Sequence, residues 1–275
     1  MTGFEFLLLR IAPFLLHGAA ALLLLVLAGT VAGWWEPQWH WLTYLAFAAL
    51  ATLGLLRWAE AVRERFIRET ALPQTLKRRL RSLYPHLTPK DCELAERALR
   101  QFFLACLRGN GNFVAMPSKA ADAMWAAFVR LPQAYAAWSH HALGQLPEHS
   151  PAQVLGKKLH GNDGLRRTWY WTCKEEAIDP RKPSRLPLLF ALDAKLNIPD
   201  GFIYATGVAP AAPKGRARGI EATHFGTSFS DPSYAGHAQD FGGAEPRRSG
   251  LSFLDSDSGT DGSDGDGGGD GGGGD

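Results

Sequence analysis

Cysteine is scarce in this chain of 275 residues. Cys92, Cys106 and Cys173 are the only three, and they lie far apart in the sequence without forming a C-x-x-C pair. Three scattered thiols exclude a disulfide framework and argue against a structural zinc site. We therefore expect the globular part of the chain to lie in a reducing compartment.

Motifs for metal ions and nucleotides are also missing. The GNGN stretch at 109–112 follows no predicted strand and precedes no GK[ST], so it is not a phosphate-binding loop. No H-E-x-x-H or H-x-x-x-H spacing occurs among the histidines. The one grouping of candidate ligands is His140, His141, His149, His160, Asp163 and Cys173. We expect no metal site and no cofactor.

Charge is nearly absent from residues 1–58. Residues 11–35 carry no charged side chain and are long enough to cross a hydrocarbon core of about 30 Å. Residues 41–58 form a second apolar run after the short connection EPQWH. Tryptophans that cluster around the connection are typical of an interfacial belt, and they are Trp34, Trp35, Trp39 and Trp41. The sequence predicts a transmembrane two-helix hairpin.

Basic residues lie on only one side of this hairpin. Arg10 precedes the first run, the connection has no Lys or Arg, and many basic residues follow Arg57. The positive-inside rule then predicts a multi-pass protein of the bacterial inner membrane with both termini in the cytoplasm. A cleaved signal peptide is the alternative, but the first run is long for one and a second run follows at once.

His17 is the ionisable residue inside the first predicted span. Neither span contains an acidic partner that would define a proton or ion path. We expect a neutral imidazole that is hydrogen-bonded to a residue such as Thr52 on the returning helix.

Residues 59–87 form a basic stretch directly after the hairpin. Pro73 divides it into two short juxtamembrane helices, and Pro85 ends the second. A basic stretch beside a span favours contact with anionic lipid headgroups, whereas a solvated face that only fixes topology explains the same charges. The candidate headgroup contacts are Arg63, Arg65, Arg68, Lys77, Arg78, Arg79 and Arg81.

Strand signals are absent from residues 88–205, which predict an all-α cytoplasmic domain of five or six helices. Thr88 and Asp91 mark one helix start, and Asp193 is expected to pair with nearby cations. Residues 206–275 are rich in Pro, Gly and Asp and predict a disordered tail. No Glu follows Glu245, which excludes an EF-hand loop, although weak attraction of cations by the tail is an alternative.

The segment MPSKAADAMWAAFVR predicts a helix that Ser118 caps, with Asp122 in its first turn and Trp125 and Phe128 on its buried face. Together with the preceding Phe-Val-Ala, it resembles the M-P-S-x-x-x-D-x-x-W-H-x-F-I signature of bacterial membrane-anchored glycine-rich-domain-protein-like sequences. Pro117 is the fifth matching position, and RLPLLFALDAKLNIPDGF is similar to the segment that follows in that family.

This resemblance extends over about residues 88–204 and implies a small membrane-anchored chain with a glycine-rich tail, but no particular activity. The family's usual His after Trp is Ala126 here. Any ligand or base role of that His is therefore absent from this chain, which favours binding over catalysis.

We expect an integral membrane protein that presents a cytoplasmic interaction or adaptor domain to a protein partner. One alternative is a membrane-bound enzyme with a site near Asp122, His140 and His141, between the helices at 117–131 and 163–178. The other is binding of anionic lipid through residues 57–81, and the same stretch is a weaker candidate for nucleic acid.

Overall fold

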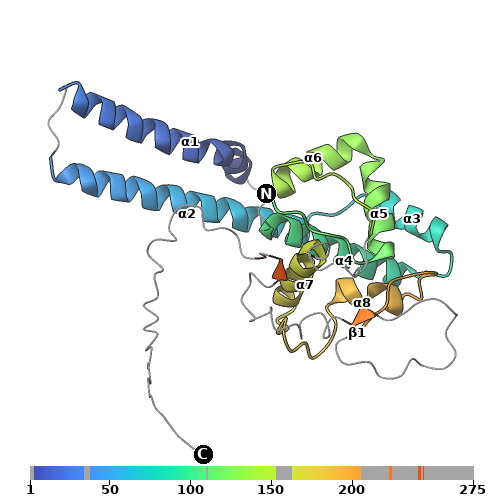
Figure 1. Ribbon diagram of the computed structural model, residues 1–275. Coiled ribbons are helices and arrows are strands. Elements are labelled where there is room, and N and C mark those ends of the chain that lie inside the picture. The colour runs from blue at the N-terminus through green and yellow to red at the C-terminus, as the bar shows by residue number, and fades with distance from the viewer. Residues whose placement is uncertain are drawn as a thin grey trace, which may run out of the picture.

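The computed structural model describes residues 3–33, 38–109, 111–152, 163–205, 223–224, 241–242 and 244. Within these ranges the chain forms eight α-helices and two short strands (Figure 1). The helices are α1 (Gly3–Val31), α2 (His40–Glu69), α3 (Gln74–Leu83), α4 (Pro89–Arg108), α5 (Lys119–Val129), α6 (Pro132–Leu143), α7 (Asp163–Glu175) and α8 (Leu188–Lys195). The prediction of a predominantly helical fold is confirmed.

The strands are a small departure from the sequence prediction. β1 (Tyr204–Ala205) pairs in parallel with β2 (Thr223–His224), with Tyr204 opposite Thr223 and Ala205 opposite His224. Two residues are too few to show the alternation by which a strand is recognised in sequence. The pair therefore could not be found from periodicity.

Helices α1 and α2 form an antiparallel pair that projects from the rest of the molecule (Figure 1). Both are long and apolar enough to cross a membrane. Only 6% of the most apolar window of α1 is buried, and 11% of that of α2. A helix in the core of a soluble protein is mostly buried, so these two helices do not serve as core helices here. Trp34 and Trp35 lie outside the described residues.

Helix α2 continues through residue 58 without a break. The predicted second span and the first juxtamembrane helix are thus one helix of 30 residues, about 45 Å long. Ala59 and Val62 pack against Leu8, Leu9 and Ala12 of α1 in a small cluster of their own. Five residues later, Ile67 is fully buried in the main core. Helix α2 therefore belongs to both the hairpin and the domain.

His17 and Thr52 each hydrogen-bond within their own helix. His17 Nδ1 lies 3.2 Å from the carbonyl oxygen of Pro13, and Thr52 Oγ1 donates to the carbonyl oxygen of Ala48 at 2.8 Å. The expected bond between the two side chains is not formed. A hydroxyl near the preceding turn of its own helix finds an acceptor there without any help from a neighbouring helix.

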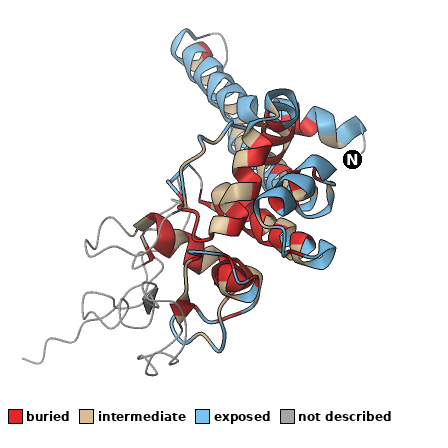
Figure 2. Ribbon diagram, turned by 90° about the vertical axis from the view of Figure 1, so that its right-hand side faces the viewer, coloured by how far each residue is buried: buried red, intermediate tan, exposed pale blue. Residues whose placement is uncertain are grey.

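Helix α4 lies at the centre of the domain and packs against α2, α3, α5, α6, α7 and α8. Its start lies where Thr88 and Asp91 predict it. A capping box fixes this start: Thr88 Oγ1 accepts from the Asp91 N–H, and Asp91 Oδ2 accepts from the Thr88 N–H. Buried residues are concentrated in the central helices of the domain (Figure 2).

Aromatic side chains fill the space between α4, α5 and α6. The ring centroids of Phe102 and Trp125 are 4.9 Å apart, those of Phe103 and Trp138 are 4.7 Å apart, and Phe128 lies 5.6 Å from Trp138. Such offset and edge contacts stabilise beyond the area they bury. Trp125 and Phe128 thus form the buried face of α5 that the sequence predicts.

Most of the predicted tail lies outside the described residues, but β2 pairs with β1, and a second short piece contacts α7. Phe241 and Ala244 are buried, and the Phe241 ring lies 5.5 Å from that of Tyr170 on α7. The prediction of disorder from residue 206 onward is wrong at this point. An isolated aromatic residue in a polar segment can still bury enough apolar surface to hold its neighbours.

Candidate functional site

The N-terminus of α5 is where the two segments of the predicted family signature meet. Ser118 Oγ accepts from the Ala121 N–H at 3.2 Å and donates to Asp193 Oδ1 of α8 at 2.6 Å. Pro117, also buried, accepts through its carbonyl oxygen from the Tyr204 hydroxyl at 3.0 Å. Ser118 therefore caps α5 as expected, and it also ties the helix to α8.

Asp193 is the central acceptor of this cluster. It is only 2% exposed, and its carboxylate accepts from the N–H groups of Lys119 (2.8 Å), Ala120 (3.1 Å) and Phe202 (3.0 Å) in addition to Ser118. The expected pairing with cations is wrong, because backbone donors at the positive end of α5 satisfy the carboxylate. An acid inside the apolar run LLFALDAK was the signal for such a site, since a buried charge needs several partners.

Asp122 pairs with a histidine that the sequence analysis did not assign to it. His149 Nε2 lies 2.8 Å from Asp122 Oδ1, and its ring contacts that of Trp125 at 4.7 Å. Trp125 Nε1 donates to the Tyr135 hydroxyl, which donates to the carbonyl oxygen of Pro147. These contacts hold the segment after α6 against α5.

The structure does not assemble the hypothetical enzyme site. His140 and His141 lie on α6 and line a groove beside α1, whereas Asp122 lines neither that groove nor the smaller cavity of about 260 Å³ beneath Trp138. No residue of α7 lines either cavity. Helices α5 and α7 both pack on α4 and α8.

Among the described residues, no group of three or more His, Cys, Asp or Glu is placed to hold a metal ion. His160, one of the six candidate ligands, lies outside the described residues. Burial raises the pKa of the Cys173 thiol well above its usual value.

The seven basic candidates for lipid contact have diverse surroundings. Arg65 lies 3.8 Å from Glu5, and Lys77 lies 2.8 Å from Glu96. Three others, Arg78, Arg79 and Arg81, are exposed on α3, at the end of the domain away from the hairpin (Figure 1). The seven therefore do not share one surface.

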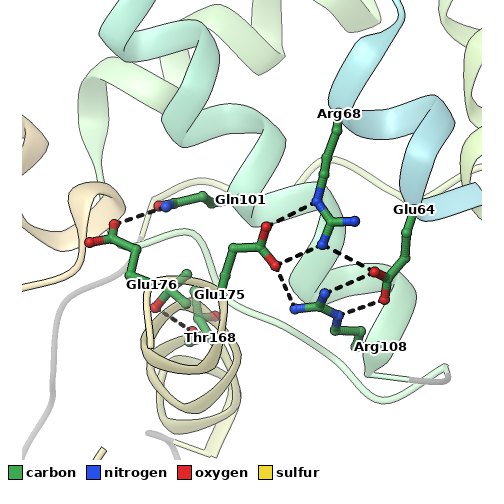
Figure 3. Close-up of polar contacts among 8 residues, drawn as sticks. Glu64, Arg68, Gln101, Arg108, Thr168, Glu175 and Glu176 are labelled. Atoms are coloured by element: carbon green, nitrogen blue, oxygen red, sulfur yellow. Dashed lines mark hydrogen bonds and ion pairs between the residues drawn. The ribbon is translucent and has the colours of Figure 1, made fainter. Parts of the chain in front are cut away.

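Arg68 belongs to a network of two arginines and two glutamates that joins three helices (Figure 3). Arg68 of α2 and Arg108 of α4 each contact both Glu64 of α2 and Glu175 of α7. Arg108 is bidentate to Glu64 at 2.8 and 3.0 Å, and Arg68 is bidentate to Glu175 at 3.1 and 3.0 Å. The hydrogen bond from Arg108 lowers the pKa of the Glu64 carboxyl.

A second arginine of α4 holds the C-terminal end of α2. Arg100 Nη1 donates to the carbonyl oxygen of Ile67, and Nη2 donates to that of Thr70 at 2.6 Å. Glu96 orients this guanidinium through an ion pair of 2.6 Å. A cation at a helix C-terminus satisfies free carbonyl groups and stabilises the helix dipole. Helix α2 is thus fixed to the domain at its end and along its side.

A groove of about 1230 Å³ lies where the hairpin enters the domain, between α1, α2 and α6. Its polar lining is mainly basic and comprises Arg10, Arg63, Glu60, His140, His141 and Gln145. Its apolar lining comes largely from the first half of α1. Cys106 and Leu107 of α4 complete the lining. Sequence reasoning missed this groove because its residues come from four separate helices.

Comparison with known proteins gives one family. The UCP032817-like family model matches residues 62–226, which include both segments of the predicted signature and the groups that hold the end of α2. No curated protein and no solved structure matches the chain. The matched region covers more than half of the sequence, and the chain belongs to the UCP032817-like family.

Proposed function

We propose that the protein is a two-span membrane anchor that holds a helical interaction domain at the cytoplasmic face of the bacterial inner membrane. The observation that carries this proposal is the contrast between the two ends of α2. Its first half exposes large apolar side chains such as Tyr44, Phe47 and Leu50. Its last turns instead bury Val62 and Ile67, and Arg100 of α4 holds their end. Lipid is the solvent that stabilises such an apolar surface.

The orientation follows from the charges at the two ends of the hairpin. Arg10, Arg57 and Arg65 lie at the domain end, and the connection at residues 34–39 carries no Lys or Arg. The positive-inside rule then favours a cytoplasmic domain. The Trp39 side chain, 83% exposed near the connection, fits the opposite interface.

The proposed partner of the domain is a protein with an acidic surface. Arg78, Arg79 and Arg81 are exposed on the side of the domain that points away from the hairpin (Figure 1). A bilayer that surrounds the hairpin would lie at the other end of the molecule. These three arginines are therefore better placed for a soluble acidic partner than for lipid headgroups.

Membrane fractionation and cysteine labelling test the anchor. We expect the full chain to stay in the membrane fraction after alkaline carbonate washing and to leave it only with detergent. In intact cells, a membrane-impermeant maleimide should label the variant Gln38→Cys in the connection. The variant Ser82→Cys on α3 should react only after lysis. The parent chain gives the background from its own thiols.

Recovery of the chain in the soluble fraction without detergent would overturn the anchor. Labelling of Ser82→Cys in intact cells would instead overturn the orientation alone. Crosslinking in membranes tests the adaptor role: a partner captured by the parent chain should be lost when Arg78, Arg79 and Arg81 are replaced by Gln. Replacement of the exposed Arg57, Arg97 and Arg130 by Gln is the control. Equal capture by both variants would contradict the role of α3.

A further inference from the structure

The groove between α1, α2 and α6 lies at the depth where a membrane around the hairpin would end. Arg10 precedes the uncharged part of α1, and Glu60 and Arg63 follow the apolar part of α2. All three line the groove. On the proposed anchoring, which this inference requires, the groove therefore opens at the level of lipid headgroups.

Cations exceed anions in the groove. Arg10 and Arg63 carry two fixed positive charges, and Glu60 is the one carboxylate among its lining residues. Glu60 lies 3.5 Å from Arg57, which does not line the groove, so part of its charge is already compensated. His140 and His141 of α6 also line the groove, and His141 Nδ1 lies 2.6 Å from the carbonyl oxygen of Ala137. The lining favours an anionic ligand.

Arg63 differs from the other partly buried arginines of the domain. Within the described part of the chain, its guanidinium makes no ion pair within 4.0 Å, and its buried Nε has no hydrogen-bond partner. Arg100 and Arg108, which are also partly buried, have carboxylate partners. The partly buried Arg167 donates to two backbone carbonyl oxygens. Glu60 attracts this guanidinium without forming an ion pair, so a partly buried group with an unsatisfied Nε keeps hydrogen-bonding capacity for a ligand.

Gly144 makes room for this guanidinium. The residue ends α6 with φ 71°, and a Cβ there would lie 2.4 Å from Arg63 Nη1. A side chain at this position would force the guanidinium of Arg63 to shift. The C-cap of α6 therefore supports the guanidinium from one side, while the groove opens on the other.

The remaining wall is apolar and continues along the hairpin. Phe14 and Leu16 of α1 line the groove and are 67% and 57% exposed. A ligand that matches both parts has an anionic head and a long apolar tail. We propose that the groove binds one anionic phospholipid, with its phosphate at Arg63 and Arg10 and its acyl chains against α1.

Native mass spectrometry of the full chain released from phosphatidylglycerol–phosphatidylcholine nanodiscs tests this proposal. We expect one phosphatidylglycerol to be retained per chain in preference to phosphatidylcholine of the same acyl length. Arg63→Gln should weaken this retention about tenfold or more, since a charge-assisted contact is lost. Arg78→Gln, which removes the same charge from α3, is the matched control and should not change it.

Two further variants keep the test informative if Arg63→Gln does not fold. The exposed Arg10→Gln should weaken retention, and Glu60→Gln should strengthen it because a repulsive charge is removed. Glycerol phosphate without acyl chains should not displace the lipid; displacement would overturn the role of the apolar wall. Equal retention by Arg63→Gln, Arg10→Gln and Arg78→Gln would overturn the site.

Carbonate washing tests the membrane anchor separately from the lipid-binding groove. Every variant that folds is also tested for resistance to carbonate washing. Absence of a preference for phosphatidylglycerol in the parent chain, with intact membrane insertion, refutes the groove alone, whereas loss of insertion in the parent chain refutes the anchor.

Discussion

Asp193 connects parts of the domain that are distant in sequence. One carboxylate accepts from Ser118, from two N–H groups of the first turn of α5, and from Phe202 beyond α8. Each of these donors is buried or partly buried, so none could readily turn to water if the acceptor were lost. The side chain therefore stabilises the contact between α5 and α8 as a unit.

We expect Asp193→Asn to lower the free energy of unfolding by about 1.5–3 kcal/mol, because its amide nitrogen faces donors where the carboxylate oxygen accepted them. Denaturant unfolding of the full chain in mild detergent measures the change. Asp200→Asn, on the exposed turn after α8, is the control and should stay within about 0.5 kcal/mol of the parent. An Asp193→Asn variant as stable as this control would contradict the assigned role.

The lowered pKa of the Glu64 carboxyl makes the free energy of unfolding depend on pH. The hydrogen bond from Arg108 and the charges of Arg108 and Arg68 lower its pKa in the folded state, against a smaller opposing effect of burial. A depressed carboxyl pKa stabilises the fold above the unfolded value of about 4.3, and this contribution is lost as the pH falls through the folded pKa.

The substitution Glu64→Gln should therefore lower the free energy of unfolding by on the order of 1 kcal/mol at pH 7. It should also make this free energy less dependent on pH below about 4.5. Urea midpoints at pH 7 and at about pH 3 measure both effects. Glu93→Gln, exposed on α4, serves for comparison. If both variants lose the same stability on acidification as the parent, Glu64 does not act through this network.

The cysteines should be unreactive in the folded chain. Burial raises the pKa of the Cys106 thiol to about 12, and it also raises the pKa values of Cys92 and Cys173. At pH 8 only about one Cys106 thiol in 10⁴ is then ionised, whereas an unperturbed thiol is ionised to roughly a quarter. Alkylation by iodoacetamide, followed by mass spectrometry, should be at least about 100-fold slower in the native than in the denatured chain. Comparable rates would show that the thiols are accessible.

At the scale of elements, the continuity of α2 determines how the hairpin and the domain move together. No break separates its apolar half from the turns that Arg68 and Arg100 hold. An interruption between these halves should leave both intact while loosening the connection between them. Ala61, exposed on α2, is the position at which to make it.

A proline at position 61 removes a helical hydrogen bond and costs about 3 kcal/mol in a helix interior. We expect Ala61→Pro to broaden the distance distribution between spin labels at Gln38→Cys and Ser82→Cys, measured by electron–electron resonance. Ala61→Ser should leave the distribution narrow. A narrow distribution in both variants would mean that contacts between α1 and the domain are sufficient to fix the hairpin.

At the scale of the whole molecule, the sequence predicted those features that depend on residues close together in the chain. The Ser118 cap, the helix start at Thr88 and Asp91, and the aromatic face of α5 depend on residues within one or two helical turns, and all three are confirmed. The length and apolarity of α1 and α2 could also be predicted from the sequence. The relation to glycine-rich-domain-like sequences stays a prediction.

Long-range partners could not be predicted in the same way. Asp193 and Ser118 are separated by 75 positions and Arg68 and Glu175 by 107, so the choice among several carboxylates and donors is made by tertiary packing. Tertiary packing likewise determines that Asp122 pairs with His149 rather than with His140 or His141. Because the groove at Arg63 requires four helices in place, no single segment could have revealed it.

Helix α2 is long and continuous, so a tilt of the hairpin is transmitted to the domain. A hairpin accommodates a thicker or thinner membrane by changing its tilt. If the domain stayed fixed, a tilt of about 10° would displace the far end of a 45 Å helix by roughly 8 Å. Because the ion pairs among Glu64, Arg68, Arg108 and Glu175 oppose bending at the junction, the domain must rotate with the helix. On the proposed anchoring, the orientation of α3 relative to the bilayer would then change with the local bilayer thickness.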